Sequence, residues 1–205
     1  MSIVIIDYGL GNLRSVAAAV EKLGIKPVVS SELEHIEAAS KLILPGVGAF
    51  ENGIKNLRDL GLIEPLTKMV IKGGKPILGI CLGFQLMARE SFEFGHYKGL
   101  GWLDASVRIL ETNDIKLHVP HVGWDDLIQI KESLLFDGIP SDALFYYVHS
   151  FYVDCMEDSI VVGQCEYGVC FPAVIHKNNI HATQFHPEKS QFYGLALLKN
   201  FIEKA

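Results

Sequence analysis

The sequence has few cysteines, no block of basic residues and no long apolar run. Only four of its 205 residues are cysteine, and no two of them form a C-x-x-C pair. A disulfide framework and a structural zinc site are therefore not expected, and a reducing cytoplasm fits this cysteine content best. No apolar run approaches the ~20 residues that span a bilayer, and the start, MSIVIIDYG, lacks the cationic residues of a signal peptide. We expect neither a membrane segment nor a leader.

The overall charge argues against polyanionic partners. The formal net charge is −6, and the basic residues are scattered along the chain. Nucleic acid and anionic membrane surfaces are therefore poor candidates for binding. Hydrophobic residues make up 49% of the chain, enough for a substantial core. A length of 205 residues without an evident linker predicts one domain, residues 1–205.

The order of apolar segments predicts an α/β fold. In the first half, short apolar strands alternate with segments of helical periodicity, which is typical of a parallel sheet with crossover helices. The expected strands here are 2–6, 26–29, 42–44 and 76–80, and the expected helices 12–24, 33–40, 54–71 (with possible breaks at Gly61 and Pro65) and 82–90. The second half predicts strands around Val107 and Val119, at 146–153, 160–165, 169–175 and 180–185, and a closing helix at 193–203. We expect a central mixed, mostly parallel sheet flanked by helices.

A cysteine stands where the fourth expected strand meets a helix. The segment Gly79 to Gly83 reads G-x-C-x-G, the pattern of a nucleophile elbow with Cys81 in the nucleophile's place. The flanking glycines give room to a strained turn, and a helix N-terminus favours the thiolate. The backbone N–H of Leu82 would point to a developing oxyanion. A buried cysteine at an ordinary strand end is the alternative for this motif alone.

A candidate base follows near the C-terminus, in the segment TQFHPEKS. A cysteine nucleophile needs a base that is held by a third group. His186 and Glu188 are two residues apart, so at a strand end their side chains would point the same way. The alternative is an ordinary charged turn. The segment LPGVGAF supplies a further element, because Gly46 and Gly48 leave backbone N–H groups free to face an anion, although Pro-Gly also marks plain turns.

These motifs together resemble the class I, or triad, glutamine amidotransferases, whose flavodoxin-like α/β fold the chain should then share. The match rests on G-x-C-x-G-x-Q and H-P-E, and it extends to IDYGLGNLRS, PGVGAF, VPHVGWD, YYVHSFY and TQFHPEKS. The pattern is similar to that of glutaminase subunits of imidazole glycerol phosphate synthases, which serve histidine biosynthesis. The resemblance covers essentially the whole chain.

The resemblance implies a role for each matching residue. Cys81, His186 and Glu188 would be the catalytic triad, with oxyanion donors at Leu82 and Val47, whose amide would rotate into place. Glutamine would be bound by a set drawn from four segments: Gly46, Gly48, Gln85, Glu93, Ser150 and Phe151. A synthase partner, by resemblance a β/α barrel, would form a heterodimer through Trp124, Tyr146 and Lys189. The reaction would need no cofactor and no metal.

Some positions depart from the family's pattern. Ala182 stands where glycine is usual, Asp125 replaces a more usual Asn, and ESFEFGHYKGLGW is one residue longer than usual, which affects the alignment of Glu93. The last two features resemble paralogues that supply ammonia for acetamidino-sugar synthesis in surface polysaccharides. The acceptor is therefore left open between these two pathways.

Other interpretations fit these residues less well. A cysteine hydrolase or peptidase of similar fold is disfavoured by Gln85 and the H-P-E order, and a non-catalytic flavodoxin-like module by the complete triad. Gly9-x-Gly11 could indicate a dinucleotide site, but Arg14 occupies the place of the third glycine. His118, His121 and His149 fit no standard zinc spacing, so packing or hydrogen bonding is the expected role of all three histidines.

Overall fold

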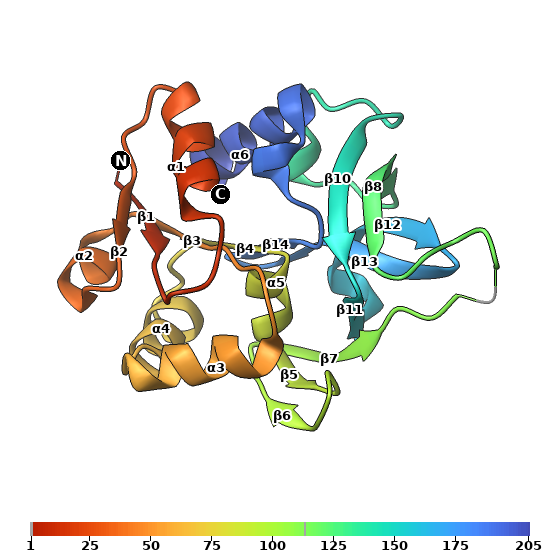
Figure 1. Cartoon of the computed structure of the whole chain (residues 1–205). Coiled ribbons are helices and arrows are strands. Elements are labelled where there is room, and N and C mark those ends of the chain that lie inside the picture. Colours follow the sequence, from red (N-terminus) through yellow and green to blue (C-terminus); the bar gives the residue numbers. More distant parts are fainter. Residues whose placement is uncertain (1, 113) are drawn as a thin grey trace.

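An eight-stranded mixed sheet forms the centre of the fold in a computed structural model that describes residues 2–112 and 114–205 (Figure 1). In spatial order its strands are β2 (Val28–Ser30), β1 (Ile3–Ile6), β3 (Lys41–Leu44), β4 (Ile77–Ile80), β14 (Ile180–Thr183), β13 (Val169–Lys177), β12 (Val161–Tyr167) and β9 (Ile128–Gln129). The four pairings from β2 to β14 are parallel, and the three from β14 to β9 are antiparallel. The expectation of a mixed α/β sheet is confirmed.

Helices cover both faces of the parallel half. Helices α1 (Leu13–Lys22) and α6 (Gln191–Lys204) lie on one face, and α3 (Phe50–Asp59) and α4 (Ile63–Thr67) on the other (Figure 1). The strand period of two explains this: Ile3 and Ile5 join the core beneath α1 and α6, whereas Val4 and Ile6 join the core beneath α3. Helix α2 (Leu33–Ala38) packs near β1 and β2. Within the described residues no helix is long and apolar enough to cross a bilayer.

The segment expected to be helical over 54–71, with possible breaks at Gly61 and Pro65, consists of three helical pieces. Helix α3 ends at Asp59, α4 begins at Ile63, and a π-helical turn, η1 (Lys68–Lys72), follows without interruption. The break lies at Gly61, whose φ of +67° favours glycine. Pro65 does not break the chain, since it lies in the first turn of α4, where its missing N–H removes no helical hydrogen bond.

Two smaller sheets extend the second half. One pairs β8 (His121–Asp126) with β10 (Leu144–His149), and the other has the order β11 (Phe151–Cys155), β7 (Leu103–Ile109), β5 (Ala88–Ser91) and β6 (Tyr97–Lys98). The short 3₁₀ turns are η2 (Leu134–Phe136), η3 (Asp158–Ile160) and η4 (Pro187–Lys189). The expected strand over 146–153 is thus two strands in different sheets, separated at Ser150. Strand β8 begins at His121 rather than at Val119, because Pro120 has no N–H to donate to a ladder.

The expected helix over 82–90 was wrong in its second half. Helix α5 (Leu82–Leu86) is only five residues long, and the chain from Ala88 continues as β5. The backbone carbonyl of Met87 accepts hydrogen bonds from the N–H groups of Trp102 and Leu103 instead of continuing the helix. Tertiary pairing with a distant segment therefore overrides the local helical preference.

Candidate active site

Cys81 lies at the carboxyl end of β4, immediately before α5. Its backbone is strained, with φ 52° and ψ −107°, in a region that non-glycine residues rarely adopt. The N–H of Cys81 donates to the Thr183 carbonyl oxygen at 2.8 Å, so the strained turn is tied to the neighbouring strand β14. This is the geometry that the G-x-C-x-G motif predicts for a nucleophile elbow.

The glycines of this motif are required for close packing. A Cβ on Gly83 would lie 1.8 Å from the Leu44 carbonyl oxygen, and one on Gly79 would lie 2.9 Å from the Phe84 nitrogen. Neither glycine has a positive φ, so the unusual conformation belongs to the cysteine itself. The sequence-based expectation placed the glycines correctly but attributed them to backbone freedom, whereas their role is to let α5 approach β3 and β4.

His186 and Glu188 form a buried ion pair. The His186 Nδ1 and Glu188 Oε1 atoms are 2.8 Å apart, and both side chains are 1% exposed. Burial lowers the pKa of His186, but the neighbouring Cys81 thiolate and the Glu188 carboxylate outweigh it and raise the pKa to about 10. Glu188 belongs to η4 rather than to a strand, so the predicted contact is present for a different local reason: Pro187 begins a turn that brings residue 188 back beneath the ring.

The second nitrogen of His186, Nε2, is left for the Cys81 thiol, because Nδ1 is paired with Glu188. Nε2 is buried and has no hydrogen-bond partner among the described residues apart from its approach to Cys81. Gln184 Nε2 lies 3.6 Å from the Cys81 sulfur on another side. The three groups Cys81, His186 and Glu188 are therefore brought together in the order that proton transfer from sulfur to imidazole needs.

A cavity of about 680 Å³ opens over Cys81 and collects most of the predicted substrate residues. Its lining includes Val47, Gly48, Cys81, Leu82, Gln85, Glu93, Ser150, Phe151 and Lys189. Gly46 does not line the cavity. Gly46 belongs to the loop 45–49 between β3 and α3. A Cβ on Gly46 would come 2.7 Å from the Leu82 side chain, so the glycine lets this loop approach the start of α5. Trp124 and Tyr146 also lie outside the cavity lining.

Gln85 and Glu93 are held by backbone groups at the cavity. Gln85 Nε2 donates to the Phe151 carbonyl oxygen at 2.8 Å, and the Phe50 N–H donates to Glu93 Oε2 at 2.6 Å. Burial raises the pKa of Glu93, and the Phe50 hydrogen bond opposes this shift. An uncompensated carboxylate at this place would favour a ligand with a positive charge, such as the ammonium group of an amino acid.

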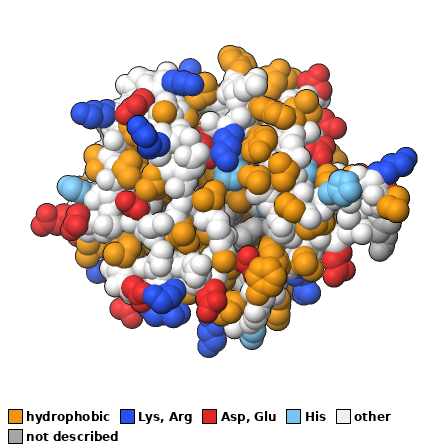
Figure 2. Space-filling model, viewed as in Figure 1, with side chains coloured by type: hydrophobic (Ala, Val, Ile, Leu, Met, Phe, Trp, Pro, Cys, Tyr) orange, Lys and Arg blue, Asp and Glu red, His pale blue; other side chains and the backbone are white. Residues whose placement is uncertain are grey.

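Trp124, Tyr146 and Lys189 form one surface cluster. The rings of Trp124 and Tyr146 are 6.0 Å apart at their centroids, and the Lys189 ammonium group lies 5.6 Å from the Tyr146 centroid. Trp124 is 43% exposed, although it is among the largest apolar side chains. On the face shown in Figure 2, hydrophobic side chains gather around a hollow near the middle, and charged side chains lie mostly toward the periphery. Such a surface is typical of protein association.

Several cavity residues were not identified from the sequence. His149, which was assigned to packing or hydrogen bonding, lines the cavity next to Ser150. Phe94 also lines it, is 88% exposed and meets the Phe151 ring edge to face. Gln184 contacts the nucleophile, and its position two residues before His186 was the available signal. Phe94 lies in the lengthened segment and offered no signal beyond that insertion.

One group of potential metal-ligating atoms lies in the second half. Among the described residues, His121, Asp125 and Cys165 bring one such atom each to within 4.8 Å of one another. His121 is already paired with Asp125 and His149, and burial raises the pKa of the Cys165 thiol to about 12. We therefore treat these side chains as a hydrogen-bonding group.

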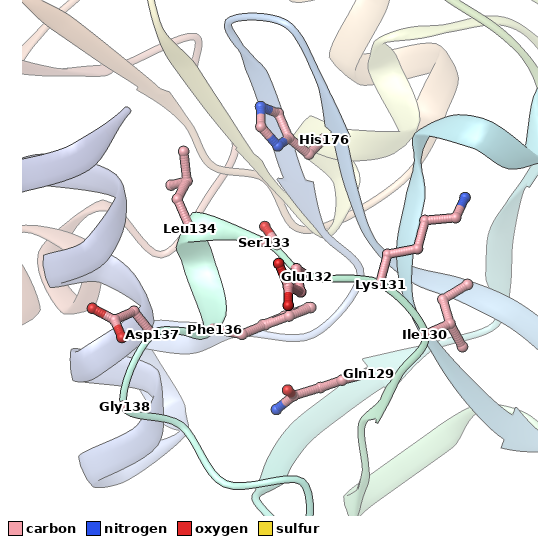
Figure 3. Close-up of a pocket in the computed structure, with 10 residues that line it drawn as sticks. All are labelled: Gln129, Ile130, Lys131, Glu132, Ser133, Leu134, Phe136, Asp137, Gly138 and His176. Atoms are coloured by element: carbon pink, nitrogen blue, oxygen red, sulfur yellow. The ribbon is translucent and has the colours of Figure 1, made fainter.

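A second cavity, of about 750 Å³, lies between the segment 129–138 and β13 (Figure 3). Two of its polar side chains are already engaged: Gln129 donates to the Ile139 and Pro140 carbonyls, and Lys131 to the Asp158 and Ser159 carbonyls. Figure 3 shows Lys131 and Asp137 at opposite sides of the view, without convergence on one point. This cavity contains none of the predicted site residues, so the cavity over Cys81 is the candidate active site.

Comparison with known proteins agrees with this geometry. The family model for "Glutamine amidotransferase class-I" matches residues 4–205. A Campylobacter jejuni (strain RM1221) protein named "Imidazole glycerol phosphate synthase subunit HisH 1" is 48% identical, and the match covers 98% of each chain. Proteins of the same subunit name from Geobacter sulfurreducens and Aquifex aeolicus are 45% and 44% identical, over 98% and 100% of this chain and 98% of each relative.

Solved structures share the fold at lower sequence identity. A glutamine amidotransferase crystal structure superimposes with a TM-score of 0.75 at 23% identity, over 98% of this chain and 97% of that one. The structure of PurLQS from Thermotoga maritima gives 0.74 at 19% identity, with the same coverage. At these identities the structural likeness speaks for the fold alone.

Proposed function

This chain belongs to the class I glutamine amidotransferase family, and on that basis we propose that it is the glutaminase subunit of an imidazole glycerol phosphate synthase. In this proposal residues 1–205 form one glutaminase domain that works in the cytoplasm. It hydrolyses glutamine to glutamate and delivers the ammonia to a cyclase partner in histidine biosynthesis. The observation that carries the proposal is the buried His186–Glu188 pair, in which the second ring nitrogen of His186 is unpaired among the described residues and the His186 pKa is raised by the neighbouring Cys81, a residue that lines the cavity.

The first half of the reaction forms a thioester. The Cys81 sulfur attacks the side-chain carboxamide carbon of glutamine, and the carbonyl oxygen becomes an oxyanion. Backbone N–H groups of Leu82 and Val47 stabilise this oxyanion, an effect worth about 3 kcal/mol per donor in comparable sites. His186 then gives a proton to the departing nitrogen, so that the C–N bond breaks and ammonia leaves. Glu188 holds the imidazole tautomer and its positive charge.

The second half restores the enzyme. His186, neutral after the ammonia has left, takes a proton from a water molecule that attacks the thioester carbon. The C–S bond breaks, and glutamate and the Cys81 thiolate are regenerated. Glu93 would receive the ammonium group of the amino-acid head, while Gln85 and the backbone of Ser150 and Phe151 would hold the remaining polar atoms. Gly46 lets the loop 45–49 lie close to α5, and Gly48, which lines the cavity, has a φ of +109° that favours glycine.

A partner protein is needed for the ammonia to be useful. Ammonia released into water is protonated and no longer a nucleophile, so a shielded path to a second active site follows from the chemistry. We propose that the cluster of Trp124, Tyr146 and Lys189 contacts a cyclase subunit, a β/α barrel, in a heterodimer. Lys189 both belongs to this cluster and lines the cavity, so it would connect partner binding to the glutamine site.

The division of labour can be tested with one substitution. In a complex with its cyclase partner, Cys81→Ser should abolish glutamine-dependent turnover and leave ammonia-dependent turnover near the wild-type level. The matched control is Cys170→Ser, at an exposed cysteine outside the cavity, which should preserve both activities. Loss of both activities in Cys81→Ser would contradict the proposal.

The acceptor requires a separate experiment. Co-purification of tagged chain from its own cells identifies the synthase that binds it, and that pair is then supplied with glutamine and an imidazole-pathway acceptor. The proposal expects imidazole glycerol phosphate as product. Activity only with a sugar acceptor would instead assign the chain to acetamidino-sugar synthesis, with the glutaminase chemistry unchanged.

A further inference from the structure

A network of four groups leads from the protein surface to the glutamine cavity: the side chains of Asp125, His121 and His149 and the Phe151 carbonyl, here called the Asp125 network. The Asp125 carboxylate lies 3.2 Å from His121 Nε2, and His121 Nδ1 lies 3.3 Å from His149 Nε2. His149 Nδ1 in turn lies 3.0 Å from the Phe151 carbonyl oxygen. Asp125 is partly exposed, whereas both histidines are buried. The triad mechanism uses neither histidine.

The Phe151 carbonyl, at the inner end of the Asp125 network, is part of the proposed substrate site. The Phe151 carbonyl oxygen also accepts the hydrogen bond from Gln85 Nε2 at 2.8 Å. It therefore has two side-chain donors, Gln85 and His149, on a segment that lines the cavity over Cys81. Whether His149 donates to this oxygen decides how firmly the Phe151 backbone is held.

When both histidines are neutral, the Asp125 network has one proton too few to form all three of its hydrogen bonds. Three contacts need three donated protons, because the carboxylate at one end and the carbonyl at the other only accept. Two neutral imidazoles supply one proton each. The three contacts are therefore satisfied together only when the Asp125–His121 pair binds one additional proton.

The surroundings of His121 can accommodate that proton. Its ring is sandwiched between Tyr147 and Tyr167, with centroids at 4.9 and 3.8 Å and interplanar angles of 16°, an arrangement that favours a cationic ring. Burial lowers the pKa of His121 below its ordinary value, and the Asp125 carboxylate opposes this shift. The titratable groups around the two histidines are Asp125 and Asp126 from β8, Tyr147 from β10, Cys165 and Tyr167 from β12, and the triad residue His186.

Loss of the additional proton removes the hydrogen bond from His149 to the Phe151 carbonyl. A hydrogen bond to a carboxylate is stronger than one to a neutral acceptor, so one proton stays on His121 Nε2 facing Asp125. That bond polarises the His121 ring and makes its Nδ1 a stronger acceptor, which draws the second proton to His149 Nε2. His121 then donates from Nε2 to Asp125, and His149 donates from Nε2 to His121. The Nδ1 atom of His149 is left without a proton, facing the Phe151 carbonyl oxygen.

We propose that Asp125, His121 and His149 are positioning residues for glutamine, and that they hold the Phe151 carbonyl only while they share one additional proton. This proposal rests on the glutaminase function proposed above and adds a proton dependence to its substrate site. The proton is bound at acidic pH and lost as the pH rises. The KM for glutamine should therefore rise at alkaline pH by more than titration of the triad residues alone would cause.

Asp125→Asn separates this effect from the chemistry of the triad. An asparagine amide can donate to His121 Nε2, so the variant has three protons for three contacts without titrating. We expect its KM for glutamine to approach that of the wild type as the pH falls below 6.5, and to be about fivefold lower at about pH 8, the effect of one net hydrogen bond. The matched control is Asp126→Asn, which removes the same charge one residue away, on an exposed side chain.

The outcomes are distinct. A KM ratio of variant to wild type that is constant across this pH range, or the same pH trend in Asp126→Asn, overturns the proton-sharing network while the glutaminase assignment stands. Absence of glutamine hydrolysis by the wild-type complex would overturn the proposed function, and this proposal with it.

A measurement on the unsubstituted protein checks the same claim. Nitrogen-15 NMR of the histidine side chains reports which ring nitrogen carries the proton. We expect His149 to be the Nδ1–H tautomer at acidic pH and to change to Nε2–H as the His121 signal titrates. A His149 tautomer that stays the same through the His121 titration would contradict the proposal.

Discussion

Replacing Gly83 with alanine tests how tightly the nucleophile is positioned. The new Cβ would lie 1.8 Å from the Leu44 carbonyl oxygen, whereas ordinary contacts begin at 3.4 Å, so α5 and β3 must separate by about 1.6 Å. The obstacle is backbone in the centre of the sheet and cannot rotate away. Because α5 begins at Leu82, the displacement moves Cys81 and the adjacent oxyanion donor together.

The expected consequence is catalytic. A misplacement of about 1 Å at reacting groups can cost about a hundredfold in rate, so kcat/KM for glutamine in the partner complex should fall by about a hundredfold or more. Glutaminase rate is measured by glutamate release, ammonia-dependent turnover reports the partner, and circular dichroism reports the fold.

A matched substitution isolates the effect of position. In Gly53→Ala the new Cβ also approaches α5, at 2.9 Å, but it meets the tip of the Leu86 side chain, which can move. Gly53 lies within α3, where alanine gains about 1 kcal/mol of helix propensity over glycine. This control should retain nearly full activity. A Gly83→Ala protein that hydrolyses glutamine at the wild-type rate would refute the reasoning about the close approach of α5.

Three further substitutions test other parts of the site. Glu188→Gln should lower kcat by about a hundredfold or more, since the His186 cation loses its partner. The neighbouring Cys81 and the Glu188 carboxylate together raise the His186 pKa from 6.5 to about 10, so the part of this stabilisation that comes from Glu188 is full below pH 6.5 and lost toward pH 10. Denaturant unfolding should therefore find the variant destabilised relative to the wild type by more at about pH 6 than at about pH 9. Equal deficits at both pH values would argue against the ion pair. Gln85→Leu should raise the KM for glutamine through loss of the hydrogen bond to Phe151, in steady-state kinetics, and an unchanged KM would remove Gln85 from substrate binding. Trp124→Ala should weaken partner binding by about tenfold or more in calorimetry, as loss of a large exposed aromatic at an interface does, and unaltered affinity would move the interface elsewhere.

Structure that depends on residues close together in the sequence could be predicted from short motifs. The strained turn at Cys81 and the pairing of His186 with Glu188 are both consequences of short motifs, and both are present in the fold. The alternation of β1 between two cores likewise follows from its side-chain period.

Features set by distant contacts could not be predicted. Helix α5 ends at Leu86 because the Met87 carbonyl pairs with the N–H groups of Trp102 and Leu103. No local sequence pattern predicts this pairing. The division of the segment around Ser150 between two sheets is a tertiary outcome of the same kind. His149 was assigned to packing because the sequence reveals neither its neighbour His121 nor its place on the cavity wall.

The most direct test of the account is to trap the covalent intermediate. The wild-type complex is mixed with isotope-labelled glutamine, quenched in acid within one turnover and digested, and the peptides are analysed by mass spectrometry. The account predicts a labelled γ-glutamyl group on the peptide that contains Cys81, absent from Cys81→Ser. Glutamate release without any acyl group on Cys81, or with the label on another residue, would contradict it.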